Sequence, residues 1–165
     1  MGFARVCRGM WLASAVCGAL LTSSGGLHAA TFPEFVDPNP APGNQFGHTV
    51  VALSTGNVVI TSPLDDFAGT NAGAVYLFDG ATGVLLSTLH GSTAEDRVGN
   101  GGVTALANGN YVVASPNWDN GAITNVGAAT WGNGTTGVSG TISAANSLVG
   151  STAVDQVGNV IALSN

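Results

Sequence analysis

Short apolar runs alternate with clusters of turn-forming residues along most of this chain of 165 residues. Four such runs, rich in Val, Ile, Leu, Tyr and Phe, follow one another between residues 44 and 95 and are separated by Gly, Asn, Asp and Ser. Asp-Gly and Asn-Gly pairs adopt the positive φ that tight hairpins require. The pattern therefore predicts four antiparallel β-strands, at residues 49–53, 57–62, 73–78 and 84–89.

The same order of apolar runs occurs a second time, at residues 102–106, 110–115, 127–131 and 138–142. The sequence itself also repeats, because residues 91–100 recur at 150–159 with eight of ten positions identical. Internal similarity of this kind is the signature of a repeat architecture. We therefore expect one unit at 44–95, a second at 96–154 with a small insertion near 139–147, and the start of a truncated third unit at 155–165.

Four antiparallel strands in a unit of 52 to 59 residues have the size of a β-propeller blade. Both faces of a blade are buried against neighbours, which favours continuous apolar runs such as residues 75–78 over strict alternation. We predict an all-β fold of tandem four-stranded antiparallel β-propeller-type blades. A β-solenoid or a sandwich is the alternative, although the coils of a solenoid are shorter than these units.

The third unit contains one predicted strand where the other units contain four. A closed propeller needs at least about four blades, so we expect the chain to form an incomplete propeller and to be a fragment or a truncated reading frame. Two blades with a lone strand leave apolar faces and strand edges open. We therefore expect self-association, or further repeats, at these open blade faces.

Charge excludes two classes of partner. The chain has 3 basic and 9 acidic residues, and the basic residues are Arg5, Arg8 and Arg97. Binding of nucleic acid or of an anionic membrane surface needs a basic patch, which this composition does not provide. Disorder is also disfavoured, because 45% of the residues are hydrophobic.

The first thirty residues have the layout of a secretory signal peptide. Arg5 and Arg8 precede an apolar run at 10–21, and small residues then lead to Ala29 and Ala30. The apolar run is too short for the roughly 20 residues of a membrane span. We predict that residues 1–30 are a signal peptide, that the mature chain has no membrane span, and that it is secreted or displayed on the cell surface.

Cleavage there would change the chemistry of the chain. Both cysteines, Cys7 and Cys17, lie in the leader, so the mature protein would contain no disulfide and no thiol. Lipidation at Cys17 is left open. Lipoprotein cleavage sites have a small residue before the cysteine, whereas this chain has Val16 there. The mature chain would begin with a proline-rich lead at residues 31–43.

Specific motifs in the first unit suggest a family. Phe46-Gly47, the segment 58–63 and the strand at 73–78 together resemble the FG-GAP repeat of integrin-α-type β-propellers. The sequence departs from that pattern at Thr61-Ser62-Pro63, which replaces Gly-Ala-Pro, and at Val98-Gly99, which replaces Phe-Gly in the second unit. The resemblance implies an extracellular, non-enzymatic module for adhesion or ligand binding.

The second unit is similar to the Gly/Asn-rich repeats of large bacterial surface proteins of the filamentous-haemagglutinin-like type. The motifs that carry this similarity lie at residues 108–113, 115–121 and 130–137. It implies a bacterial cell-surface protein. Two alternatives stay open, namely a purely structural stalk repeat of a larger surface protein and an accessory repeat of an exported enzyme.

FG-GAP blades often carry a calcium loop, which needs several carboxylate or amide oxygens in one turn. The corresponding turns here, at 54–57 and 107–110, contain no carboxylate. We therefore expect no calcium, no other metal and no cofactor.

The sequence offers no catalytic constellation. The histidines are His28, His48 and His90, and the chain contains no Gly-x-Ser-x-Gly, His-Glu-x-x-His or phosphate-loop motif. Asp96 recurs as Asp155 in the repeat, and we expect both to accept backbone hydrogen bonds where units join. We therefore expect no enzymatic activity.

One loop in each unit is a candidate for contact with a protein or glycan ligand. Trp118 lies in a loop and is expected to be exposed, whereas Trp131 aligns with Leu77 and is expected in the core. The candidate ligand-contact residues are Asp65, Asp66, Trp118, Asp119 and Asn120.

Overall fold

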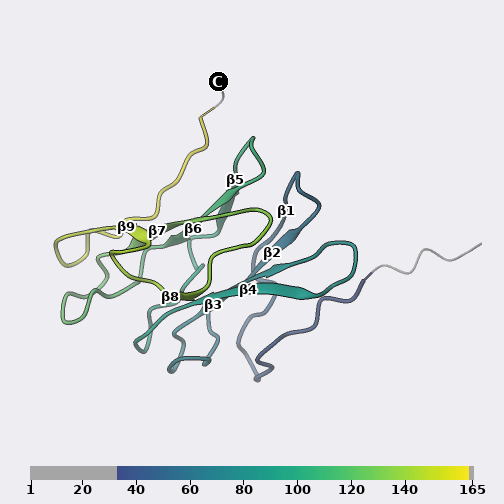
Figure 1. Ribbon diagram of the computed structural model, residues 1–165. Coiled ribbons are helices and arrows are strands. Elements are labelled where there is room, and N and C mark those ends of the chain that lie inside the picture. Colours follow the sequence, from purple (N-terminus) through teal and green to yellow (C-terminus); the bar gives the residue numbers. More distant parts are fainter. Residues whose placement is uncertain (1–32, 164–165) are drawn as a thin grey trace, which may run out of the picture. The chain divides into compact units, whose positions relative to one another are not determined.

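The computed structural model describes residues 33–163. Within that range it contains β-strands and no helix. One sheet has five strands in the order β1-β2-β3-β4-β8, and the other has four in the order β5-β6-β7-β9 (Figure 1). The strands are β1 (Val50–Ala52), β2 (Val58–Ser62), β3 (Ala74–Phe78), β4 (Leu85–His90), β5 (Val103–Ala105), β6 (Tyr111–Ser115), β7 (Ala128–Gly132), β8 (Gly140–Thr141) and β9 (Ser147–Val149).

The predicted all-β fold of blade-like antiparallel sheets is confirmed. Over the described range the two sheets do not close into a ring, as expected for an incomplete propeller. No helix able to cross a bilayer occurs among these residues. The predicted signal peptide at 1–30 lies outside the described residues.

The first four strands form an antiparallel meander, as the sequence pattern predicts. Their ends agree with the predicted ranges to within one residue. Val59 of β2 pairs with Leu77 of β3, and Val75 of β3 pairs with Leu89 of β4, so these side chains share one face of the first sheet.

The prediction for the fourth strand of the second unit is wrong. Residues 138–142 do not join the second sheet. Their strand β8 instead runs parallel to β4 at the edge of the first sheet, and the amide of Ile142 donates to the carbonyl of His90 at 3.1 Å. The crossing buries the Ile142 side chain, which is 2% exposed, in the core between the sheets.

The second sheet takes its fourth strand from β9, within and just after the segment that we expected to be an insertion. Ala128 of β7 pairs with Val149, and Ala129 pairs with Leu148. The segment from Asn133 to Asn146 therefore leaves the second sheet, covers the edge of the first and returns. The second unit thus supplies the edge strand of the first sheet, so the two units are more closely joined than two separate blades.

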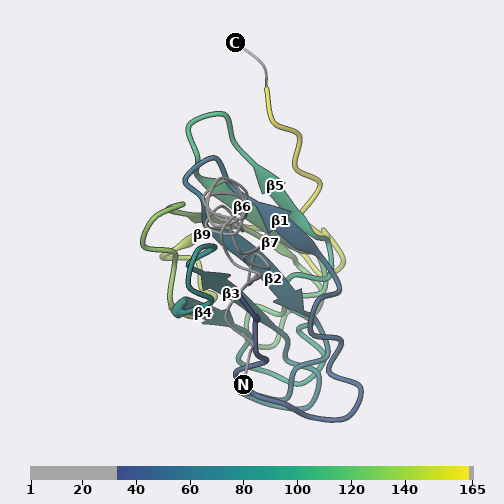
Figure 2. The same ribbon diagram turned by 90° about the vertical axis from the view of Figure 1, so that its right-hand side faces the viewer.

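The main core lies between the two sheets. Val59, Val75 and Leu77 of the first sheet belong to the same buried cluster as Tyr111 and Val113 of the second. At one side of this core β1 and β5 lie next to each other, as Figures 1 and 2 show. The core therefore depends on side chains from both repeat units.

The lead and the residues directly after it cover the opposite face of the first sheet. Phe35 contacts Phe78 edge-on, with ring centroids 5.5 Å apart, and Phe46 lies 6.0 Å from Tyr76. Ile60 lies in the same aromatic cluster. The first sheet is thus covered on both faces, by the lead with Phe46 on one side and by the second sheet on the other.

Candidate functional site

Long loops from both sheets lie at the ends of strands that run in the same direction. β2 and β4 both pair antiparallel with β3, so the loops that follow them share one end of the first sheet. The same holds for β6 and β9, which both flank β7. We call this surface the loop end, and it comprises residues 63–73, 91–98, 116–127 and 150–157.

An aspartate closes the loop that follows β4, and an equivalent aspartate closes the loop that follows β9. The Asp96 carboxylate accepts the amides of Ser92 and Thr93 at 2.7 and 2.8 Å. The Asp155 carboxylate accepts the amides of Ser151 and Thr152, both at 2.8 Å. This confirms the expectation that both aspartates accept backbone hydrogen bonds, and it explains why Gly-Ser-Thr-Ala and Asp recur together.

These loops are tied to the loops beside them by equivalent backbone bonds at both sheets. The amide of Val98 donates to the carbonyl of Ala72 at 3.0 Å, and the amide of Val157 donates to the carbonyl of Val126 at 3.0 Å. Several non-glycine residues of these loops adopt positive φ, which costs free energy and persists only where surrounding contacts fix the backbone. They are Asn71, Glu95, Arg97, Asn125, Val154 and Gln156.

Asp119 links the loop that follows β4 of the first sheet to the loop that follows β6 of the second. Its amide donates to the Asp96 carboxylate at 3.0 Å, and its own carboxylate accepts the amide of Asn125 at 2.7 Å. Asn120 beside it is exposed. Of these two candidate contact residues, Asp119 is held in the framework of the loop end and Asn120 is available to a ligand.

The adjacent aspartates of the first unit have different surroundings. Asp65 is fully buried, where it accepts the Tyr76 hydroxyl and the Asn39 side-chain amide, both at 2.7 Å. Burial, with the neighbouring Asp65 carboxylate, raises the pKa of Tyr76. Asp66 is exposed and accepts the amide of Asn71 at 2.8 Å. Asp65 therefore fastens the lead to the first sheet, and Asp66 alone of the pair faces solvent.

The expected exposures of the two tryptophans are wrong. Trp118 is 3% exposed and belongs to the core between the sheets, whereas Trp131 is 50% exposed. Trp118 occupies the position that Asp65 has in the first unit. The amide of Gly127 donates to the carbonyl of Trp118, just as the amide of Gly73 donates to the carbonyl of Asp65. In the first unit this position faces the polar side chains of the lead, and in the second unit it faces the apolar first sheet.

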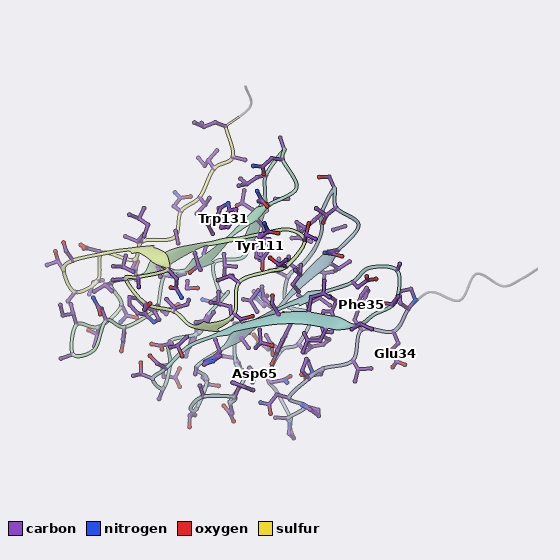
Figure 3. All side chains as sticks on the ribbon, viewed as in Figure 1. Glu34, Phe35, Asp65, Tyr111 and Trp131 are labelled. Carbon is purple, nitrogen blue, oxygen red and sulfur yellow. The ribbon has the colours of Figure 1, made fainter. Side chains whose placement is uncertain are left out.

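Trp131 is exposed because, within residues 33–163, neither sheet packs on its side of the second sheet. It follows Thr130 in β7 and so points to the opposite face from the shared core. Its counterpart Leu77 is buried by the second sheet. In Figure 3, Trp131 and Asp65 are labelled on opposite sides of β3 and β4.

Phe67 is an exposed residue of the loop end that sequence reasoning missed. Its ring lies 5.0 Å from that of His90, and it is 54% exposed. Glu95 and Arg97 lie on the neighbouring loop, where they form an ion pair at 2.6 Å. The apolar Phe67 directly after two aspartates was the signal that could have marked this position.

The turns at the other end of the sheets hold the units together. Thr55 and Asn57 both donate from their side chains to the carbonyl of Gly134, at 2.9 and 2.8 Å. These contacts occupy the turn at 54–57. Within residues 33–163 no group of three His, Cys, Asp or Glu side chains is placed to hold a metal ion.

Comparison with known families assigns repeats to both halves. Residues 34–78 match the FG-GAP repeat, and residues 105–159 match a repeat of unknown function, DUF5650. No curated protein and no solved structure matches the chain. The chain thus carries an FG-GAP-like repeat, which confirms the resemblance drawn from its motifs, and it is a β-repeat module.

The different surroundings of the two tryptophans give a spectroscopic test. In dilute solution we expect Trp118→Phe to remove emission that is blue-shifted and protected from acrylamide, because Trp118 is buried. Trp131→Phe should remove emission that is red-shifted and readily quenched. Difference spectra against the wild type isolate each contribution. Equal quenching of the two components would contradict this placement.

The Asp155 turn gives a test of pH dependence. Hydrogen bonds from the amides of Thr152 and Ser151 hold the pKa of Asp155 below its usual value of 3.8. A lowered carboxyl pKa contributes stability above the usual value, and this contribution is lost as pH falls through the folded value. We expect the unfolding midpoint of Asp155→Asn to fall less steeply below about pH 4 than that of the wild type. Parallel profiles down to about pH 2 would contradict this role.

Proposed function

We propose that this protein is a secreted or cell-surface, non-enzymatic β-repeat module that binds a protein or glycan through the loop end. The observation that carries the proposal is the FG-GAP match at residues 34–78, which spans the lead and the first three strands. Loops that project from a rigid β-scaffold are where such modules place their binding residues.

The loop end is built to present a fixed surface. Asp65, Asp96 and Asp119 direct their carboxylates inward to backbone and side-chain donors. These bonds hold the loops in place before a partner arrives, which lowers the entropy lost on binding. The groups that face solvent are therefore presented in one arrangement.

The exposed side chains of the loop end suit recognition of sugars or of a polar protein surface. Phe67 offers an apolar ring, while Asp66 next to it and Asn120 on the adjacent unit offer hydrogen-bonding groups. An aromatic ring next to a carboxylate can contact both the apolar and the hydroxyl surfaces of a sugar.

Charge narrows the class of partner. Arg97 is the sole basic residue within 33–163, and it is paired with Glu95. A strongly acidic partner would therefore meet repulsion with little compensation. Neutral glycans and neutral or basic protein surfaces remain as the favoured partners, and nucleic acid is disfavoured.

The leader and the repeats together support the cellular setting. Residues 1–30 have the layout of an export signal, and FG-GAP repeats suit an extracellular module. We further propose a bacterial surface protein that uses neither calcium nor another cofactor. A structural stalk is the competing function, and it would need no exposed binding group at the loop end.

A binding screen with matched variants tests the loop end. The full chain, produced in an exporting host, is applied to a glycan array and to a panel of immobilised extracellular-matrix proteins. We expect saturable binding to at least one probe, weakened about tenfold or more by Phe67→Ala, as for truncation of an interface anchor.

Val84→Ala is the matched control, because Val84 is 58% exposed in the turn before β4, at the other end of the first sheet. It should bind as the wild type does. Absence of saturable binding to every probe would favour the stalk, and equal losses in both variants would exclude the loop end as the binding surface.

A further inference from the structure

Asparagine is followed directly by glycine at four positions of the chain, which are Asn100, Asn108, Asn120 and Asn133. In such a pair the glycine amide nitrogen can reach the asparagine side chain easily, because glycine has no Cβ to crowd the approach. The reaction needs a glycine amide that is free to lose its proton and an asparagine side chain that is free to turn toward it. The four pairs are equivalent by sequence, and the structure separates them.

Three of the four glycine amides are held by hydrogen bonds. The amides of Gly101 and Gly109 each donate to a backbone carbonyl at 3.0 Å. The amide of Gly134 donates to the side-chain oxygen of Asn110, also at 3.0 Å. In these pairs the glycine nitrogen can attack only after its hydrogen bond has broken, which requires a local opening of the fold.

The asparagine side chains of the same three pairs are held as well. Asn133 accepts two backbone amides of its own turn, at 2.8 and 3.0 Å, and Asn108 accepts one at 3.1 Å. The side-chain amide of Asn100 donates to the Asn117 side chain at 3.1 Å. Rotation of these side chains toward the following nitrogen therefore costs additional free energy.

The pair Asn120-Gly121 differs in both respects. Asn120 and Ile123 form an antiparallel bridge, with amide–carbonyl bonds of 3.0 and 3.2 Å, so Gly121 and Ala122 make a two-residue hairpin turn. Within residues 33–163, neither the Gly121 amide nor the Asn120 side chain has a hydrogen-bond partner. Residues 120–124 are exposed, and no atom lies within 4 Å of the place that a Cβ on Gly121 would take.

We propose that Asn120 is a site of intramolecular deamidation, in which the Gly121 nitrogen attacks the Asn120 side chain. The nitrogen loses its proton and bonds to Cγ, the Cγ–Nδ2 bond breaks, and Nδ2 takes up a proton and leaves as ammonia. A succinimide ring results. Water then opens the ring at one of its two carbonyls. One opening gives aspartate, and the other gives isoaspartate, in which the main chain runs through Cγ.

The reaction changes the charge and the backbone of the loop end. Either product carries a carboxylate next to Asp119, where Asn120 carries a neutral amide. Isoaspartate also adds a methylene group to the main chain, which disturbs the pairing of Asn120 with Ile123. The loop end therefore becomes more acidic as the protein ages. The reaction needs no ligand, so it proceeds whether or not the loop end binds one.

Peptide mapping of the full chain tests the proposal. The protein is incubated in mildly alkaline buffer, once folded and once in concentrated urea, and is then denatured and digested briefly with chymotrypsin. Cleavage after Trp118 and Trp131 separates Asn120 from the other pairs, and mass spectrometry distinguishes amide from carboxyl at each site. In the folded chain we expect Asn120 to react at least about tenfold faster than any other pair. In urea the four rates should become similar, because the protecting hydrogen bonds are lost.

Two variants test the cause. Asn120→Gln should abolish the fast reaction, because glutamine would have to close a larger ring. Asn110→Ala removes the acceptor of the Gly134 amide, and it should speed the reaction of Asn133 by about threefold or more. Circular dichroism establishes that each variant is folded. Equal rates for the four pairs in the folded chain, a fast reaction that persists in Asn120→Gln, or an unchanged Asn133 rate in Asn110→Ala would each overturn the proposal.

Discussion

The apolar contact between the two sheets is the interaction on which the rest of the structure depends. The second sheet buries the side chains of Val59, Val75 and Leu77, which pack in one cluster with Tyr111 and Val113. Short strands with few charges gain most of their stability from such burial. The loop end is positioned by this core, because each of its loops begins where a packed strand ends.

The sequence predicted the strands well where local chemistry decides the structure. Turn residues and apolar runs located the first four strands, and the repeated aspartates Asp96 and Asp155 have the expected backbone partners. Strand pairing was less predictable. The apolar run at 138–142 shows that a segment will be buried but not which sheet edge it joins, and β8 joins β4.

The candidate site was predicted only in part, because burial depends on what covers each face. Trp118 and Asp65 occupy equivalent positions, yet one faces an apolar sheet and the other faces Asn39 and the Tyr76 hydroxyl. Trp131 and Leu77 are equivalent as well, but only Leu77 has a sheet packed on it. Repeat alignment transfers the direction of a side chain, whereas its exposure is a property of its neighbours.

Native-state hydrogen exchange of the full chain tests most directly whether the two units form one cooperative structure. If both sheets depend on their shared core, the slowest amides of β2 and β3 and those of β6 and β7 should exchange with the same opening free energy and the same denaturant dependence. The amide of Ile142, which joins the second unit to β4, should open with them or just before them. Opening of one sheet at a clearly lower free energy, with the other still protected, would contradict this account.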